Sequence, residues 1–307
     1  METGETETIS APAILTTTES HFRVLLITDL HSDAEERLNE KTRDMVRTFV
    51  AHFEPHLVAG LGDLWCGDSH PEAAAMWMRR DLDFLGGLGC PWGLALGNHD
   101  WCGDFESFWN TVARTPNAVA PVGDGAGSFR IELRSGSGEP AWDLFFLNSG
   151  DAWEVPRRTE WFEAEMTLLR HKRGREVPAL CCFHIPTGNY QAVIDGAKTQ
   201  GVGNESVLGW GDDDGAVADI LTRLGLVRAC FCGHSHRNDF HFVDRGTLFA
   251  YARPTGFGGY GGEDLSKGAT ELELDMDSGD FRFRSVFLQD EMWCANDWTD
   301  STRLFSE

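Results

Sequence analysis

Five apolar runs of the sequence end in side chains that bind metal ions or transfer protons. The last run leads into CFCGHSHRNDF, residues 230–240, where a single serine separates two histidines. In open α/β sheets, ligands bind outside the carboxyl ends of the strands, so five such ends can meet in one pocket. The candidate metal ligands at these positions are Asp29, His31, Asp63, Asn98, His184, His234 and His236.

The types of these side chains select the class of metal ion. Four histidines, two aspartates and one asparagine are more donors than one catalytic zinc ion uses. They suit two borderline ions such as Mn, Fe or Zn, and they do not suit calcium, which prefers a cage of oxygen atoms. Two ions about 3.5–4 Å apart form the clamp that catalyses hydrolysis of phosphate esters.

Each motif has an ordinary explanation when it is taken alone. DLH suits a turn or a helix cap, and FHIP suits a core histidine. The order of all five motifs, each after an apolar run, is what indicates a metal site. If the backbone stays extended beyond each strand, residues two apart face the same side. On that condition Asp29 faces the same way as His31, and His234 the same way as His236.

The elements that must position these side chains alternate between apolar strands and amphipathic helices. Strands are expected at Phe22–Asp29, His56–Asp63, Trp92–Asp100, Leu144–Gly150, Ala179–His184, Arg228–His234, Thr247–Ala252, Thr270–Asp275 and Phe281–Leu288. Helices are expected at Ala34–Phe53, Pro71–Leu85, Glu160–Leu169 and Ala216–Leu224. The early strands are continuously apolar and the last two alternate, which favours an α/β fold of two helix-covered sheets.

The chain divides into three predicted segments. Residues 1–20 are rich in Thr and Glu and are predicted to form a flexible N-terminal tail. Residues 21–290 are predicted to form the catalytic domain, and residues 291–307 a C-terminal extension. Arg134–Pro140 is expected to be a hairpin or surface loop. The basic run Arg170–Arg175 is expected to close the preceding helix, where positive charge favours the helix dipole.

The charge balance argues against several classes of partner. The chain has 26 basic and 49 acidic residues and a formal net charge of −23, so nucleic acid is not an expected partner. The sequence has no basic amphipathic helix that would indicate binding to a membrane surface. It also has no run of about 18 apolar residues that would indicate a membrane-spanning helix. The first twenty residues lack the features of a signal peptide. The eight cysteines include no CxxC pair and are expected to be free thiols, which favours a cytoplasmic location.

The motifs TDLHSD, GLGDLW, LGNHDWCGD, CCFHIP and CGHSHRNDF resemble those of the calcineurin-like metallophosphoesterases, over roughly Phe22 to Leu288. FHIP, GNESV, GHSHRND and YARPTGFGGYG resemble a plant and fungal subgroup that is similar to purple acid phosphatases. Plant members of that subgroup are often named inactive. The resemblance implies a four-layer α/β/β/α sandwich of two mixed sheets, with a dinuclear metal site at their carboxyl edges.

The resemblance also implies a role for each candidate residue. The first ion would be bound by Asp29, His31 and His236, the second by Asn98, His184 and His234, and Asp63 would bridge the two. His99 would contact the phosphate or the leaving oxygen, with Asp100 fixing its orientation. The two histidines of GHSH would then serve different ions.

One departure from purple acid phosphatases concerns the metal. Those enzymes have a tyrosine three residues after the bridging aspartate, where this chain has Cys66, and they lack a histidine at the position of His31. The ferric, tyrosinate-coloured site is therefore disfavoured. Cys66 is either a packed thiol or a replacement thiolate ligand, and the first alternative is favoured.

The expected function is hydrolysis of phosphomonoesters by in-line attack of a hydroxide held between the two ions. The substrate would be a phosphorylated small molecule or a phosphoprotein, and Arg253 and Trp101 are candidate substrate contacts. The glycines after Arg253 either contact phosphate or form a tight turn. Asn238 and Asp239 either orient the preceding histidines or belong to an ordinary turn. A phosphodiesterase acting on cyclic or nucleotide-linked diesters and a non-catalytic, protein-binding scaffold are the alternatives.

Overall fold

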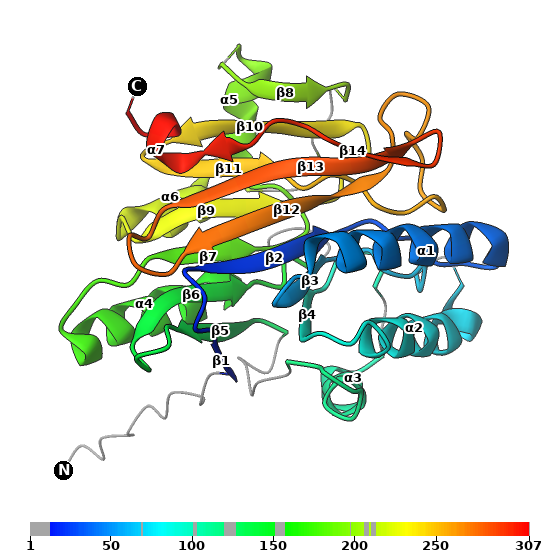
Figure 1. Cartoon of the computed structure of the whole chain (residues 1–307), viewed down its shortest axis with the longest axis horizontal. Helices are drawn as coiled ribbons and strands as arrows, with labels where there is room; N and C mark the ends of the chain where they lie inside the picture. The colour runs from blue at the N-terminus through cyan, green and yellow to red at the C-terminus, as the bar shows by residue number, and fades with distance from the viewer. Residues whose placement is uncertain are drawn as a thin grey trace.

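Two mixed β-sheets pack face to face at the centre of the molecule, and helices cover their outer faces (Figure 1). The structure is a computed structural model that describes residues 13–68, 70–100, 103–119, 127–150, 157–196, 198–205, 209 and 213–306. The predicted α/β architecture of two helix-covered sheets is confirmed.

The eight-stranded sheet has the spatial order β1 (Ala13–Thr16), β5 (Phe129–Arg134), β6 (Pro140–Phe146), β7 (Ala179–Cys182), β9 (Val227–Cys232), β11 (Thr247–Tyr251), β10 (Asn238–Asp244) and β8 (Gln200–Gly203). The strands β6, β7, β9 and β11 run parallel to one another. The outer face of this sheet packs against α4 (Arg157–Arg173), α6 (Ala216–Arg223) and the short segment of a 3₁₀ turn (Gly188–Tyr190) and α5 (Gln191–Ile194).

The second sheet has the spatial order β14 (Met292–Ala295), β13 (Phe281–Gln289), β12 (Gly268–Asp275), β2 (His21–Ile27), β3 (Leu57–Leu61) and β4 (Trp92–Ala95), and β15 (Thr299–Asp300) also pairs with β13. Its strands β2, β3 and β4 are parallel. The helices α1 (Glu36–Phe53), α2 (Pro71–Gly86) and α3 (Phe105–Val112) cover its outer face, and α7 (Ser301–Leu304) ends the fold.

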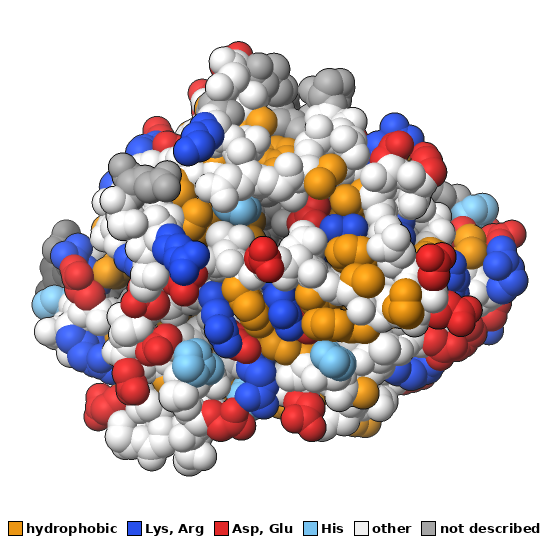
Figure 2. All heavy atoms as spheres, turned by 45° about the horizontal axis from the view of Figure 1, so that its top comes forward, with side chains coloured by type: hydrophobic (Ala, Val, Ile, Leu, Met, Phe, Trp, Pro, Cys, Tyr) orange, Lys and Arg blue, Asp and Glu red, His pale blue; other side chains and the backbone are white. Residues whose placement is uncertain are grey.

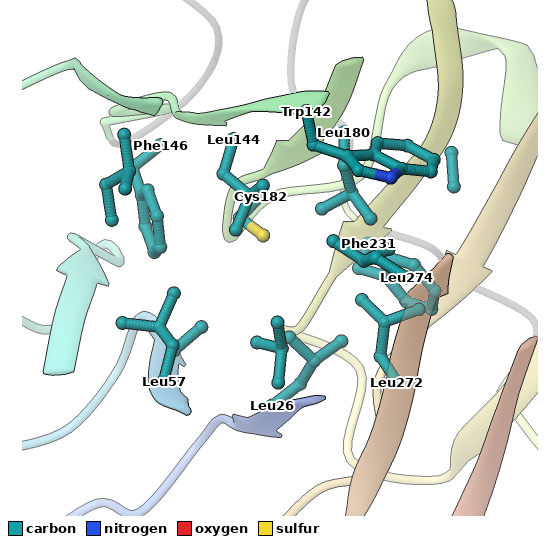
Figure 3. Close-up of a cluster of buried hydrophobic side chains, with 14 of the residues drawn as sticks. Leu26, Leu57, Trp142, Leu144, Phe146, Leu180, Cys182, Phe231, Leu272 and Leu274 are labelled. Atoms are coloured by element: carbon teal, nitrogen blue, oxygen red, sulfur yellow. The ribbon is translucent and has the colours of Figure 1, made fainter. Parts of the chain in front are cut away.

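Burial on both faces explains the continuously apolar strands. In β2, Val24 and Leu26 point into the core between the sheets, whereas Leu25 and Ile27 pack under α1. Figure 3 shows Leu26 with other side chains of the core between the two sheets. The strands β3, β7 and β9 are buried in the same way.

The structure corrects several sequence-based boundaries. Residues 13–16 form β1, which pairs in parallel with β5, so the predicted tail cannot extend to residue 20. Met292–Ala295 pairs with β13 and is therefore part of the fold, not an extension beyond it. The helix α4 continues through Arg173, so most of the basic run lies inside its last turn. The turn expected at Arg134–Pro140 is confirmed, because it joins antiparallel β5 and β6.

The described cysteines are all free, and those of β7 and β9 are buried. Among the helices of the described residues, none has the length and apolar character needed to cross a membrane.

Candidate metal centre

The candidate ligands follow the carboxyl ends of five parallel strands, three in one sheet and two in the other. Asp29 and His31 follow β2, Asp63 follows β3, Asn98 follows β4, His184 follows β7, and His234 and His236 follow β9. Because the two sheets pack face to face, these strand ends bring residues that are up to about two hundred positions apart into contact, as with His31 and His236.

Three of these side chains form a first group. His236 Nε2 lies 3.1 Å from Asp29 Oδ1 and 3.0 Å from His31 Nε2. His31 Nε2 lies 4.0 Å from Asp29 Oδ1. Ligand atoms of one ion with bonds of about 2.1 Å lie roughly 3–4 Å apart, so the spacing of this group fits a single ion.

A second group consists of Asp63, His184 and His234. His184 Nε2 lies 2.9 Å from Asp63 Oδ2, and His234 Nδ1 lies 3.3 Å from His184 Nε2. The ligand atoms of each group all lie within 4.8 Å of one another. His234 and His236 thus belong to different groups, as the resemblance implied.

Asp63 lies between the two groups. Its Oδ2 is 3.6 Å from His31 Nε2 of the first group, in addition to the short contact with His184 of the second. The side chain is buried, with 1% of its surface exposed. A carboxylate in this position fits the role of a bridging ligand.

Asn98 supplies the clearest sign that a cation fits here. Its Oδ1 is buried and has no hydrogen-bond partner within the described part of the chain. A buried acceptor without a partner costs about 1–3 kcal/mol, and a bound cation would remove that cost. The imidazoles and carboxylates of the site, with this amide oxygen, are the donors that Mn, Fe and Zn accept.

The backbone turns sharply at the ligands. Asp29, His31, Asp63 and His234 have φ values of 55°, 49°, 52° and 78°, in the left-handed region. Such conformations cost non-glycine residues about 1–3 kcal/mol and collect at functional sites. The condition of extended backbone at these residues is therefore not met, because β2 ends at Ile27 and β9 at Cys232, so the argument from two-residue spacing does not apply.

Neighbouring groups hold the ligands in place. His184 Nδ1 donates to Leu61 O at 2.8 Å, which directs Nε2 toward Asp63, where it can bind a cation once it has lost its proton. The amide of His234 donates to both oxygens of Asp29 at 3.1 Å, and Thr28 Oγ1 donates to Asp29 Oδ2 at 2.8 Å. Gly97 must lack a side chain, since a Cβ there would overlap the carboxylate of Asp63.

Burial and pairing perturb the protonation of the site. Burial alone would raise the pKa of both carboxyls. The charge of His236 nevertheless holds the pKa of Asp29 well below its usual range, and His184 lowers that of Asp63 to about 2. Burial opposes a charge on His184, yet Asp63 and Asp29 raise its pKa to about 9. In the metal-free protein His184 is therefore mostly protonated at neutral pH, and it must lose that proton to bind a metal ion.

Two other histidines are kept neutral. Burial lowers the pKa of His31 and of His234 to about 4 each, and the attraction of nearby aspartates only partly offsets that effect. Neutral imidazole is the form that binds metal ions. These two side chains therefore need no deprotonation to act as ligands at neutral pH.

His99 lies beside both groups, because its imidazole is within ligand distance of His31 and Asp63, and its side chain is 34% exposed. Its Nε2 is 4.0 Å from Asp63 Oδ2, and its Nδ1 is 2.7 Å from Asp68 Oδ1. Burial lowers the pKa of His99, but Asp63 and Asp68 outweigh it, so the net shift is upward. An imidazole that faces the metal groups and is held by a carboxylate suits proton donation.

The role predicted for Asp100 is wrong. Its Oδ1 accepts the amides of Leu64 and Trp65 at 2.8 and 3.2 Å, and its Oδ2 accepts the amide of Gly97 at 2.8 Å. Both oxygens are thus used to fix the two loops that carry Asp63 and Asn98. The carboxylate on His99 belongs to Asp68, and an acid shortly after the GD motif was the available sequence signal.

The role of substrate contact predicted for Arg253 is also wrong. Its guanidinium donates to Asp239 Oδ2 at 2.7 Å and to Ser266 O at 2.8 Å, stacks over Phe287, and is buried. This cation is committed to the interior and is not a substrate contact. Asp239 is thereby used for the ion pair, so it does not orient the site histidines.

Three further candidates have different outcomes. Asn238 Oδ1 accepts the amides of Asn204 and Glu205, so it fixes a turn and not a site histidine. Cys66 Sγ lies 3.4 Å from Nδ1 of His31, the nitrogen opposite the ligand atom, and burial raises its pKa to about 12, which agrees with a packed thiol. Trp101 lies outside the described residues.

The glycine-rich segment after Arg253 packs against the metal-site backbone. The amides of Thr255 and Gly256 donate to Thr28 O and Asp29 O at 2.9 and 3.1 Å, so these amides are not available to phosphate. A Cβ at Gly259 would overlap the ring of His236. The glycines therefore allow this segment to approach the ligands closely.

Comparison with known proteins agrees with this geometry. Residues 22–238 match the family model described as calcineurin-like phosphoesterase. A curated relative, "Probable inactive purple acid phosphatase 14" of Arabidopsis thaliana, is 25% identical over 296 residues, covering 80% of this chain and 73% of the relative. The chain belongs to the calcineurin-like phosphoesterase family, as the motifs indicated.

Two solved structures show the same fold. A dimetal phosphatase from Danio rerio aligns with a TM-score of 0.58 at 15% identity, over 86% of this chain and 95% of that one. GAP50, the anchor in the inner membrane complex of Plasmodium, aligns with a TM-score of 0.59 at 10% identity, over 94% of this chain and 95% of that one.

Proposed function

We propose that this protein is a phosphatase that depends on two metal ions and hydrolyses phosphomonoesters. The observation that carries the proposal is the ligand arrangement: two groups of three side chains, with Asp63 between them and His99 at their edge. When bound, two ions of the Mn, Fe or Zn class would activate water and neutralise phosphate oxygens. The residues of this chain supply the remaining functions.

His99 would donate a proton or a hydrogen bond to the phosphate or the leaving oxygen. Its Nε2 faces Asp63, and Asp68 holds its Nδ1 and favours the protonated ring. General acid catalysis of this kind contributes about 10²–10⁴-fold. His99 also lies within ligand distance of His31 and Asp63. In the proposed role it acts on the substrate and binds no ion, so its replacement should leave metal binding intact.

The overall acidity of the chain shapes the choice of substrate. Two divalent ions would outweigh the two aspartates among the ligands, so the pocket attracts an anion although the whole chain carries −23. On the face drawn in Figure 2, acidic and basic side chains are interspersed. The acidic surface is screened beyond about 8 Å, so it does not keep a small phosphate from the pocket. A polyanion would lie along that surface and be repelled by it, which favours a phosphorylated small molecule or phosphoprotein as the substrate.

The experiment compares hydrolysis of p-nitrophenyl phosphate with that of bis(p-nitrophenyl) phosphate after loading with Mn, Fe or Zn. The proposal expects faster turnover of the monoester, and loss of turnover in Asp63→Asn. Preference for the bis-ester would instead identify a phosphodiesterase.

A non-catalytic scaffold is the second candidate, because three Arabidopsis thaliana relatives are named probable inactive purple acid phosphatases and GAP50 is named an anchor. Loss of ligands would be expected in such a protein, whereas the sequence has all seven candidate ligands and six of them lie in the two groups. A metal-loaded preparation that hydrolyses neither ester would favour the scaffold.

A further inference from the structure

Lys267 is a buried cation beside the metal site. Only 3% of its surface is exposed, and no carboxylate forms an ion pair with it among the residues that the structure describes. Its Nζ donates to Tyr260 O at 2.5 Å. A buried ammonium is costly unless its surroundings compensate the charge, so this position calls for a functional reason.

The carbonyl that receives Lys267 also contacts a candidate metal ligand. His236 Nδ1 lies 3.3 Å from Tyr260 O, and the ring of Tyr260 stacks on the imidazole at 4.1 Å between centroids and 13° between planes. A proton on Nδ1 that points at this carbonyl leaves Nε2 free to bind an ion. One carbonyl oxygen therefore lies between the ammonium of Lys267 and the ligand His236.

The charge of Lys267 acts on the first group of ligands. Burial lowers its pKa to about 8, and Asp29 is the acid that most strongly opposes that shift. The ammonium is therefore still the major form at neutral pH in the metal-free protein. The ammonium is buried away from solvent, so its electric field is only weakly screened.

We propose that Lys267 is a fixed positive charge that strengthens anion binding at the Asp29, His31 and His236 position without touching the anion. The same charge repels a metal cation there, so it weakens metal binding while it favours phosphate. This inference rests on the proposed dinuclear site. It assigns to Lys267 an electrostatic role that is separate from the ligands themselves.

The sizes of the two effects follow from Coulomb's law. At an effective dielectric constant of about 20, one unit charge roughly 12 Å from a singly charged ligand changes its affinity about tenfold, and a shorter distance or a doubly charged ligand gives a larger factor. Lys267→Met should thus weaken binding of inorganic phosphate and tighten binding of one Mn²⁺ ion, each by about tenfold or more. Lys267→Arg keeps the charge and should stay close to the parent protein.

The test measures Mn²⁺ binding to the metal-free protein and inorganic phosphate binding to the Mn-loaded protein, both by titration calorimetry at pH 6.5. Opposite changes in the two affinities for Lys267→Met support the proposal, since structural damage would weaken both. Lys267→Gln replaces Lys267→Met if the latter does not fold.

Arg253→Met is the matched control, because Arg253 is a buried cation of the same connection between β11 and β12 but pairs with Asp239. It should lower thermal stability and leave both affinities unchanged. Unchanged phosphate affinity in Lys267→Met, or weaker binding of both Mn²⁺ and phosphate, would overturn the inference. A parent protein that binds no Mn²⁺ would refute the dinuclear site itself, which is a distinguishable outcome.

Discussion

Replacing Asn98 should have opposite effects on the metal-free and the metal-loaded protein. Its buried Oδ1 has no hydrogen-bond partner among the described residues, and such an acceptor costs about 1–3 kcal/mol. Leucine has nearly the same shape and no polar atom. Asn98→Leu should therefore stabilise the metal-free protein by about 1–2 kcal/mol, and raise its melting temperature by roughly 2–4 °C.

In the metal-loaded protein the sign should reverse. A ligand that binds the folded state stabilises it in proportion to its affinity, and Asn98→Leu removes one candidate ligand. The gain in melting temperature on adding Mn²⁺ should thus be smaller in the variant than in the parent protein. Differential scanning calorimetry with a chelator and with excess Mn²⁺ measures both quantities.

Asn238→Leu is the matched control for this experiment. Asn238 is equally an asparagine near the site, but its Oδ1 accepts two backbone amides at 3.1 and 3.2 Å. Its replacement should lower the melting temperature by a similar amount with and without Mn²⁺. A metal-free Asn98→Leu protein that is less stable than the parent would refute the reasoning, because the amide oxygen would then have a partner other than a cation.

Four other predictions concern the site. His99→Ala should reduce turnover of p-nitrophenyl phosphate about 10²–10⁴-fold with metal content unchanged, and a parallel loss of metal would contradict its proposed role. Asp68→Asn removes a carboxylate that raises the pKa of His99, so the alkaline limb of the pH–rate profile should move to lower pH, and an unmoved limb would exclude Asp68. Burial lowers the pKa of His31 and of His234 from 6.5 to about 4. Their contribution to stability is present above pH 6.5 and lost as the pH falls toward 4, so the melting temperature of the metal-free protein should drop over that range; a constant value would contradict the neutral, buried imidazoles. Gly259→Ala should lower Mn²⁺ affinity, because its Cβ would displace the ring of His236. Titration with Mn²⁺ measures this, and the control is Gly138→Ala, at an exposed turn where a Cβ has no neighbour within 4 Å.

The order of apolar runs predicted the central strands because those strands are buried on both faces. β2, β3, β7 and β9 each lie between a helix layer and the core between the sheets, so nearly every residue is apolar. β1 has no such signal. It lies at the edge of its sheet and is held by pairing with β5, more than a hundred residues later in the chain.

The residue types of the site could be predicted, but their local geometry could not. Four of the candidate ligands adopt left-handed backbone conformations, which sequence spacing does not reveal. The carboxylate that contacts His99 is not the one adjacent to it in the sequence. The amide of Gly67 donates to His99 O at 2.9 Å, and this contact between loops brings Asp68, not the adjacent Asp100, to the imidazole.

Long-range pairing also explains the error at Arg253. A lone arginine before a glycine-rich segment resembles a phosphate contact, but its partner Asp239 lies on the neighbouring part of the sheet and only the fold brings the two together. The glycines have an equally tertiary explanation, since they pack against the backbone of Asp29 and the ring of His236.

The most direct test of the central claim is the number of Mn²⁺ ions bound per chain, measured by elemental analysis after loading and removal of free metal. The two groups of ligands predict about two ions for the parent protein, about one for His236→Ala or His234→Ala, and fewer than one for Asp63→Asn, which lies between the groups. A parent protein with one ion or none, or an Asp63→Asn protein that keeps two, would contradict a dinuclear centre built on Asp63.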